Sequence, residues 1–241
     1  MKRTERHHLK ENLLAAWITG IRELAGGRAF RYFMGMIAAV LLVASAAYGF
    51  STWREAQASE SLARAMTIMN SPVAQESDAA PPTGPAGTFP TVDSKLEAAL
   101  PLLIETADNY PSLQQGVAAR YQAASALGVL GRTLESGAEY QKVIDSDPDG
   151  LYGGMSRLGR AEVHLASEEY DQAISLLQET VNQPQPVVPL DAALMRLGNA
   201  YKRSGRAEDA LSTYRRVIND TNGSTYRFDA TREIEILGGN R

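Results

Sequence analysis

The stretch RLGNAYKRSGRAEDALSTYRRVI, which runs from Arg196 to Ile218, spaces small and aromatic residues at intervals that decide the fold. The same order of residue types recurs 37 residues upstream, and again 37 residues before that. The matched positions in the three copies are Gly198, Tyr201, Ala210 and Tyr214, then Ala161, His164, Ala173 and Leu177, then Ala124, Leu127, Ser136 and Tyr140. Because self-similarity at a fixed period is typical of repeat architectures, the sequence predicts stacked copies of one structural unit.

Each unit is predicted to be an antiparallel pair of helices. The units are expected at residues 80–113, 117–150, 154–187 and 191–224. Where two helices cross closely, only Gly, Ala or Ser leaves room for the backbones, and larger aromatic rings fill the space alongside. Gly131 and Gly205 suit the turn between the helices, where a left-handed backbone is often needed, and Glu168 takes this place in the middle unit.

This pattern resembles the tetratricopeptide repeat (TPR), a helix-turn-helix unit that stacks into a solenoid. The resemblance implies an all-α fold of three to four repeats. In that family the first helix of each unit lines a concave face, which here would contain Ala118, Tyr121, Ser125, Gly128, Met155, Leu158, Glu162, Leu165, Met195, Asn199 and Lys202. The candidate partner-binding residues among them are Tyr121, Met155, Leu158, Glu162, Met195, Asn199 and Lys202.

The chemistry of this implied face favours an apolar ligand. Met and Leu side chains adapt to varied apolar partners. A TPR that clamps a carboxylate would carry several Lys, Arg and Asn there, and only Asn199 and Lys202 qualify. We therefore expect an apolar peptide or an amphipathic helix as the ligand. The alternative is that several of these residues are packed between helices.

An apolar segment near the N-terminus is long enough to cross a membrane. Residues 32–53 carry no charge, and we expect a transmembrane helix over residues 31–53. Residues 1–31 hold seven Lys or Arg against three Glu, so the positive-inside rule places residues 1–30 in the cytoplasm and the rest of the chain on the far side. Within residues 1–30, apolar side chains from Leu9 to Leu24 recur at helical spacing and predict an amphipathic helix on the membrane surface. A cleaved signal peptide is the alternative, because Ala44, Ser45 and Ala46 form an A-x-A pattern.

Further segments connect this helix to the repeats and end the chain. Residues 54–70 are Ala-rich and predict a helix, which we interpret as the first helix of the first repeat. Residues 71–92 contain five prolines and predict a flexible linker. The TPR-like domain is expected at 93–224, with Asp93 as a helix N-cap. Residues 225–241 are expected to form a capping helix, with Phe228, Ile234 and Leu237 turned inward.

Composition argues against several classes of function. The chain has no cysteine, which excludes disulfides and thiolate nucleophiles. Beyond residue 31 it carries 17 Lys or Arg against 25 Asp or Glu, and such an acidic body does not favour nucleic acid as a partner. The sequence shows no catalytic constellation, metal site or cofactor motif. His164 is the only histidine beyond residue 8, and we expect it to be a core residue.

The order of the parts resembles the YfgM-like family of ancillary SecYEG translocon subunits. Its members combine a short cytoplasmic N-terminus, one membrane-spanning helix and a periplasmic TPR-like domain, and the resemblance covers most of the chain from about Gly35. It implies a non-enzymatic adaptor in a bacterial inner membrane, with the translocon, a periplasmic chaperone or an unfolded client as partner. The alternative is a structural scaffold for a cell-wall or outer-membrane assembly complex.

Overall fold

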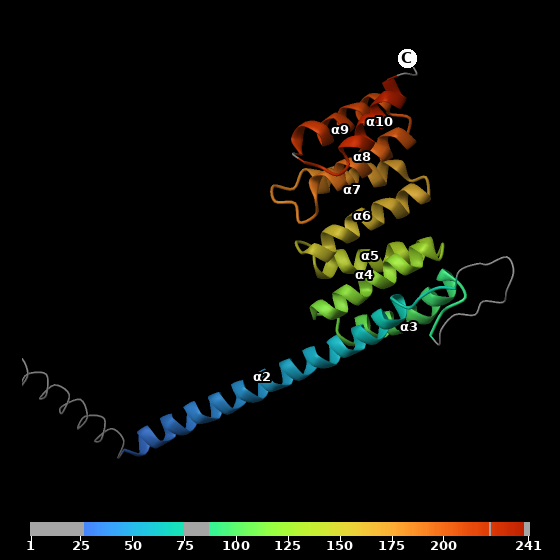
Figure 1. The fold of residues 1–241 in the computed structure, drawn as a ribbon. Coiled ribbons are helices and arrows are strands. Elements are labelled where there is room, and N and C mark those ends of the chain that lie inside the picture. Colours follow the sequence, from blue (N-terminus) through green and yellow to red (C-terminus); the bar gives the residue numbers. More distant parts are fainter. Residues whose placement is uncertain (1–26, 75–86, 222, 239–241) are drawn as a thin grey trace, which may run out of the picture. The chain divides into compact units, whose positions relative to one another are not determined.

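The computed structural model describes residues 27–74, 87–221 and 223–238, and Figure 1 shows their helices. The chain divides into two units, residues 1–54 and Glu55–Arg241, and each is described by itself. The predicted amphipathic helix of residues 9–24 and most of the Pro-rich segment lie outside the described residues. Among the described residues, all regular elements are helices apart from one isolated bridge between Val73 and Phe89. The prediction of an all-α fold is confirmed.

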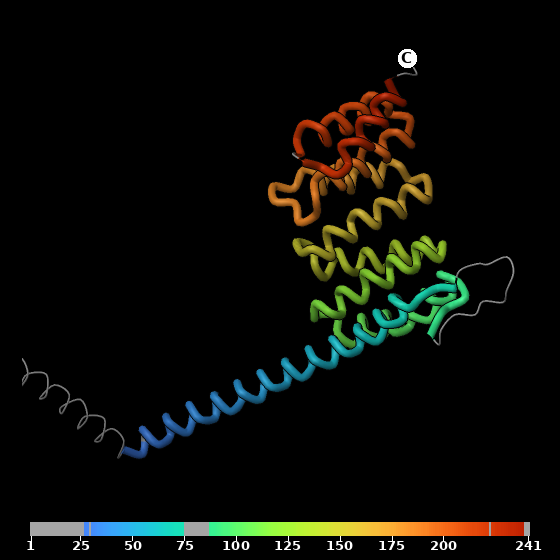
Figure 2. Tube along the Cα trace, viewed as in Figure 1, coloured from blue at the N-terminus to red at the C-terminus, as the bar shows by residue number. Residues whose placement is uncertain are grey.

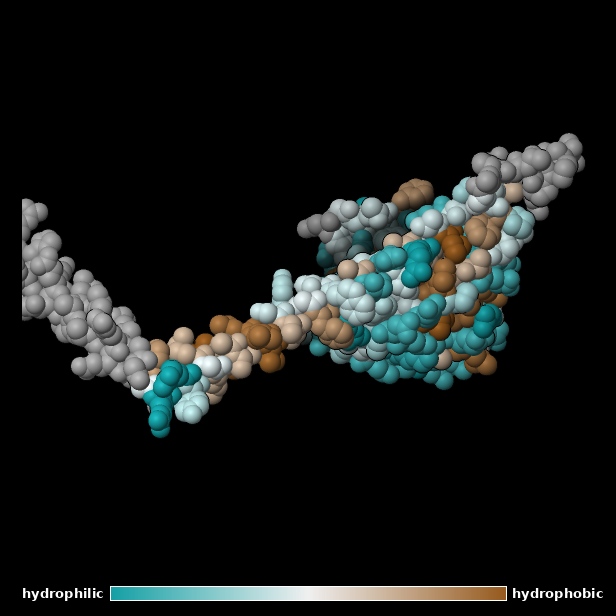
Figure 3. Space-filling view, turned by 90° about the horizontal axis from the view of Figure 1, so that it is seen from below, coloured by the Kyte–Doolittle hydropathy of each residue, from teal (hydrophilic) through white to brown (hydrophobic). Residues whose placement is uncertain are grey.

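The described part of the first unit belongs to one long helix, α2 (Arg28–Met69). From Phe30 onward this helix is long and apolar enough to cross a membrane, and the side chains of its apolar window are not buried in the protein. Figure 3 shows apolar residues around this part of α2. Its hydroxyl groups are satisfied locally, since Ser45 Oγ donates to Leu41 O at 2.8 Å and Thr52 Oγ1 donates to Gly49 O at 3.0 Å. A helix with this pattern exposes few unsatisfied polar groups.

The second unit is a stack of antiparallel helices, which Figure 2 traces from α3 to α10. The helices are α3 (Val92–Asn109), α4 (Gln114–Val129), α5 (Thr133–Ser146), α6 (Leu151–Ala166), α7 (Tyr170–Val181), α8 (Leu190–Arg203), α9 (Ala207–Asp220) and α10 (Arg227–Gly238). Within each of the pairs α4–α5, α6–α7 and α8–α9 the two helices contact one another, and each pair also contacts the next. Each helix thus buries its apolar face only against its neighbours in the stack.

The last turns of α2, from Glu55 onward, pack against α3. Ala65 is fully buried in one core cluster with Ala99 and Leu103. The hydroxyl groups of Ser61 and Thr106 are hydrogen-bonded at 2.9 Å across the two helices. This end of α2 and α3 therefore form a helix pair at the start of the stack, although a Pro-rich segment separates them in the sequence.

The start of α3 differs from the predicted one. Thr91 is the N-cap: Ser94 N donates to Thr91 Oγ1 at 3.1 Å, and Thr91 N donates to Ser94 Oγ at 3.2 Å. Asp93, expected as the cap, lies in the first turn, where its charge interacts favourably with the helix dipole. The chain enters α3 from the bridge at Phe89, whose N–H donates to Pro72 O at 3.0 Å. The two hydrogen bonds between Thr91 and Ser94 form a reciprocal capping box. It satisfies two backbone N–H groups, which a single Asp cap would not do.

The small residues of the repeat pattern lie where helices cross. Ala124, Ser136, Ala161, Ala173 and Ala210 are all fully buried, as predicted. The buried hydroxyl group of Ser136 donates a hydrogen bond to Ala124 O at 2.7 Å. This bond satisfies the hydroxyl group and joins α5 to α4.

At Gly198 even alanine would force a shift, because an added Cβ would lie 2.5 Å from Cε1 of Tyr214. Tyr214 is itself only 1% exposed, so its ring has no space to retreat.

The three turns between paired helices share one hydrogen-bond pattern, the Schellman motif. Gly131 N donates to Gly128 O, and Arg132 N donates to Leu127 O. The same two bonds close α6 and α8. The left-handed residue of the motif is Gly131 (φ 72°) and Gly205 (φ 77°), as predicted, but it is Glu168 (φ 60°) after α6. A residue with a Cβ is strained in this conformation.

Two predictions about packing are wrong. Phe228 does not turn inward but is 76% exposed, whereas Ile234 and Leu237 do pack against the core. No described helix follows α10 to cover its outer side. His164 lies outside both core clusters: its side chain is 18% exposed, and Nδ1 is 2.6 Å from Glu169 Oε2.

The strained turn predicts a stabilising substitution. Replacing Glu168 by Gly should raise the free energy of unfolding by about 1 kcal/mol, because glycine adopts a positive φ without steric cost. The converse change, Gly131→Ala, should lower it by a similar amount, since an added Cβ there meets no atom within 4 Å and the cost is that of the backbone alone. Urea unfolding of the purified chain in detergent measures both. Equal stability of Glu168→Gly and wild type would contradict the assignment of strain.

The contact of Gly198 with Tyr214 predicts a destabilising substitution. Gly198→Ala should lower the free energy of unfolding by about 1–3 kcal/mol through overpacking. Intrinsic helix propensity would instead raise it by about 1 kcal/mol, so the sign of the change identifies the clash. The matched control is Gly128→Ala, whose Cβ would meet only Ser136 Oγ, at 3.3 Å. We expect this control to be as stable as wild type or more so, and a loss at both sites would argue against a clash specific to Tyr214.

Candidate partner-binding groove

A cavity of about 580 Å³ lies between helices α4, α6 and α8, with α5 beneath it. We call it the groove. It is lined by Tyr121, Ser125, Gly128, Val129, Thr133, Ser136, Tyr140, Met155, Leu158, Gly159, Glu162, Val163, Ala166, Arg196 and Arg203. Three successive units therefore contribute to one surface, as expected of a solenoid, whose curvature generates extended binding faces.

Aromatic rings form one side of the groove. The ring centroid of Tyr121 lies 5.9 Å from that of Tyr140 and 5.7 Å from that of Tyr152. Tyr140 reaches under α6 because position 159 is glycine: a Cβ there would lie 2.4 Å from Tyr140 Cζ. Gly159 thus allows a close approach of α6 to the ring. Tyr121 and Tyr140 line the groove, and Tyr152 contacts Tyr121 from outside the lining.

The phenols of Tyr121 and Tyr140 are neutral at ordinary pH. Burial raises the pKa of Tyr121, and the nearby guanidinium of Arg196 opposes that rise. Burial also raises the pKa of Tyr140. Because the ordinary value is already about 10, both hydroxyl groups stay protonated and remain able to donate a hydrogen bond.

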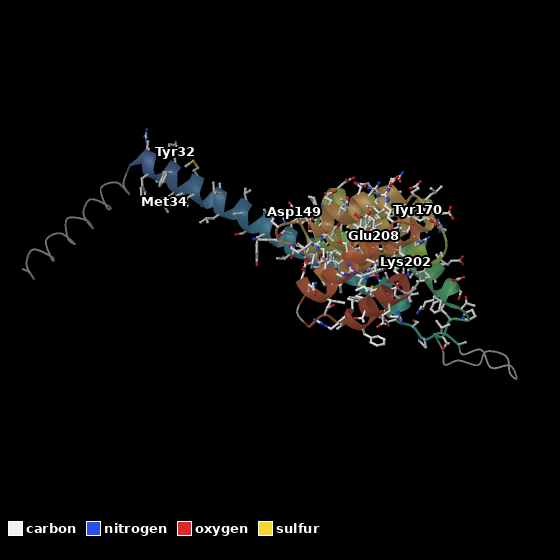
Figure 4. All side chains as sticks on the ribbon, turned by 90° about the horizontal axis from the view of Figure 1, so that it is seen from above. Tyr32, Met34, Asp149, Tyr170, Lys202 and Glu208 are labelled. Carbon is white, nitrogen blue, oxygen red and sulfur yellow. The ribbon has the colours of Figure 1, made fainter. Side chains whose placement is uncertain are left out.

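Two arginines of α8 bring positive charge to the groove. Arg203 is already engaged, since its Nη2 donates to Leu165 O at 2.8 Å and its Cζ lies 5.8 Å from the centroid of the Tyr170 ring. Tyr170 is labelled in Figure 4. Arg196 is held less firmly: Nη1 donates to Ala192 O at 3.3 Å, and Nε lies 3.4 Å from Glu162 Oε1. Arg196 and Glu162 are 37% and 48% exposed, so their ion pair is weak.

The structure brings four of the seven sequence-predicted residues together in the groove: Tyr121, Met155, Leu158 and Glu162. The other three lie elsewhere on α8. Met195 packs against the core, and Asn199 is partly buried outside the groove lining. Lys202, labelled in Figure 4, faces α10, where its Nζ lies 2.7 Å from Glu233 Oε2.

Sequence reasoning missed the two arginines of the groove, and it therefore predicted a more apolar lining than the structure has. Arg196 and Arg203 lie one residue after Met195 and Lys202, which had been placed on this face. The sequence carries a signal for this shared position. The two arginines are seven residues apart, and this separation puts both side chains on one stripe of a helix.

The lining of the groove suits the binding of another chain. Among the described residues no group of three or more His, Asp or Glu side chains is placed to hold a metal ion. The groove instead offers aromatic and aliphatic contacts together with guanidinium and hydroxyl donors, which are the features of a surface that holds another chain.

Several solved structures are similar to part of this chain. A putative kinesin light chain with nearly identical TPR-like repeats from Podosopora anserina has a TM-score of 0.49 and 16% identity, over 61% of this chain and 81% of that one. MamA has a TM-score of 0.48 and 16% identity, over 61% and 78%. MamA 41-end from Desulfovibrio magneticus RS-1 has a TM-score of 0.47 and 18% identity, over 61% and 76%. The search of curated proteins returned no match.

The family comparison covers nearly the whole described chain. The tetratricopeptide repeat-like domain matches residues 30–234, a range that includes the helix pairs, their Schellman turns and the groove. Repeat folds of this type are in general non-catalytic scaffolds for interaction with other proteins. The chain belongs to the family of tetratricopeptide repeat-like domain proteins.

Proposed function

We propose that this protein is a membrane-anchored adaptor whose repeat domain lies in the periplasm of a bacterial cell and holds other proteins in the groove. The observation that carries the proposal is the joining, in one chain, of an apolar helix able to cross a membrane to a repeat stack with an open cavity of about 580 Å³. The helix supplies attachment and the groove supplies recognition.

The membrane part of the proposal is supported by length and charge. The apolar part of α2 is exposed on all sides, which in water would be costly and in lipid is not. Arg28 and Arg31 precede this part, together with the further basic residues of the N-terminus. Under the positive-inside rule this end of the helix is cytoplasmic, and the repeat domain is on the opposite side.

The cellular role follows from that location. A periplasmic adaptor fixed to the inner membrane would meet proteins as they emerge from the secretion machinery. The order of basic segment, apolar helix and TPR-like domain is also that of ancillary translocon subunits, which supports a role in translocon-associated handling or quality control of envelope proteins. Partners in this role are the translocon, periplasmic chaperones and unfolded clients.

Site-specific crosslinking tests the proposal. A photo-crosslinking amino acid replaces Val129, which lines the groove and is 63% exposed. The matched control replaces Leu134, which is 88% exposed on α5 but lies outside the groove lining. In native membranes, the Val129 probe should capture translocon components, periplasmic chaperones or secretory clients, because these would occupy the groove. The Leu134 probe should not.

Three results would contradict the proposal. Equal capture from both probes would show that the groove has no special role. Capture of cytoplasmic proteins alone would reverse the orientation. Capture of a cell-wall or outer-membrane assembly complex that does not respond to secretory load would favour a structural scaffold instead.

A further inference from the structure

Arg196 is the less firmly held of the two arginines that line the groove, and its side chain is 37% exposed. A guanidinium has five N–H donors, and in the described structure this one makes a single hydrogen bond, at 3.3 Å, to Ala192 O. Its Nε is buried without a hydrogen-bond partner among the described residues. The nearest carboxylate, that of Glu162, stays 3.4 Å from Nε. Arg203 is instead held by Leu165 O and the Tyr170 ring.

The surroundings of Arg196 are apolar on the side of α4 and α6. Tyr140 and Leu158 are buried beneath the groove, and Met155 lines it beside them. Tyr121 lies close enough to Arg196 for the guanidinium to act on its hydroxyl group electrostatically. A positive charge at the edge of an aromatic and aliphatic surface complements a chain in which an apolar side chain and a negative charge are neighbours.

We propose that the groove recognises a peptide segment in which a large apolar side chain is flanked by a carboxylate, and that Arg196 is the residue that determines this specificity. The inference rests on the proposed function, because it names the chemical class of the protein partner held in the groove. The apolar side chain of the partner packs on Tyr121 and Met155, above the buried ring of Tyr140. The partner's carboxylate accepts hydrogen bonds from Arg196, in the two-point geometry that a guanidinium offers to a carboxylate.

The charge that the groove offers matches a single carboxylate. Arg196 is the one arginine of the groove lining that is not held by both a backbone oxygen and an aromatic ring. One carboxylate would neutralise the single positive charge of this arginine.

Glu162 has a distinct part in this recognition. It is the internal competitor of the incoming carboxylate, since it occupies Arg196 weakly when the groove is empty. The two residues therefore have opposite effects on the same ligand: loss of Arg196 weakens binding of an acidic peptide, and loss of the Glu162 charge strengthens it. A purely structural role of this ion pair would make both substitutions act in the same direction.

Peptide selection on the full chain in nanodiscs tests the inference. The probe is a phage-displayed library of random decapeptides, and the first readout is the frequency of Asp or Glu beside a large apolar residue among the selected peptides. We expect enrichment at that position. The consensus peptide is then synthesised, together with a version in which the acidic residue is changed to its amide, and both are measured by fluorescence anisotropy.

The variants give the second readout. Arg196→Gln should weaken binding of the acidic peptide about tenfold, as expected for a lost hydrogen bond to a charged group. Glu162→Gln should strengthen it about twofold to fivefold, as expected for removal of a half-exposed competing charge. Neither change should alter binding of the amide peptide. The matched control is Arg215→Gln, which removes one positive charge from an exposed position on α9 and should leave both affinities unchanged.

Two results would overturn the inference, and a further variant separates it from the proposed function. Selected peptides without an acidic preference overturn it, as does an Arg196→Gln effect no larger than that of Arg215→Gln. The Val129→Arg variant fills the groove with a longer side chain. If peptides without an acidic preference lose affinity for this variant, the groove binds protein and only the inferred specificity is wrong. If no selected peptide responds to Val129→Arg, the groove is not the binding surface, and the proposed function fails with the inference.

Discussion

The structure depends on the close crossing of two helices within each unit of the stack. Small residues at Ala161 and Ala173, and at their equivalents in the other units, bring the helix axes together because no side chain separates them. Where the neighbour is a ring, as at Gly198 beneath Tyr214, even a methyl group does not fit. The closeness of the two helix axes sets the rotation of each helix pair relative to the pair before it. Repetition of the same crossing then produces a regular stack.

The groove is a consequence of that regularity. The first helices of successive units stand side by side, so α4, α6 and α8 present one continuous surface. Gly159 lets the Tyr140 ring lie beneath α6, and Arg196 reaches the surface from the following unit. The same compact crossing that stabilises each pair therefore also brings an aromatic surface and a guanidinium together from units that are far apart in the sequence.

Periodicity was enough to predict the repeat architecture, because the demand for a small residue at a crossing recurs unchanged in every unit. Details that depend on the surroundings of one site were not predictable in this way. Either Thr91 or Asp93 could have capped α3, and the choice follows from how the chain arrives from Phe89. Phe228 lies on the same helix as apolar residues that face the core, yet its own side chain is exposed. The position of Arg196 in the groove was not predicted, because the family positions define one face of a helix. Its long side chain reaches the groove from the edge of that face.

In the proposed orientation, the groove opens on the outer side of the inner membrane. The chain contains no cysteine, so a single Val129→Cys substitution gives a unique thiol in the groove. We would treat cells whose outer membrane has been permeabilised with a maleimide that does not cross the inner membrane. We expect this thiol to react before the inner membrane is opened. Labelling only after the inner membrane has been disrupted would contradict it.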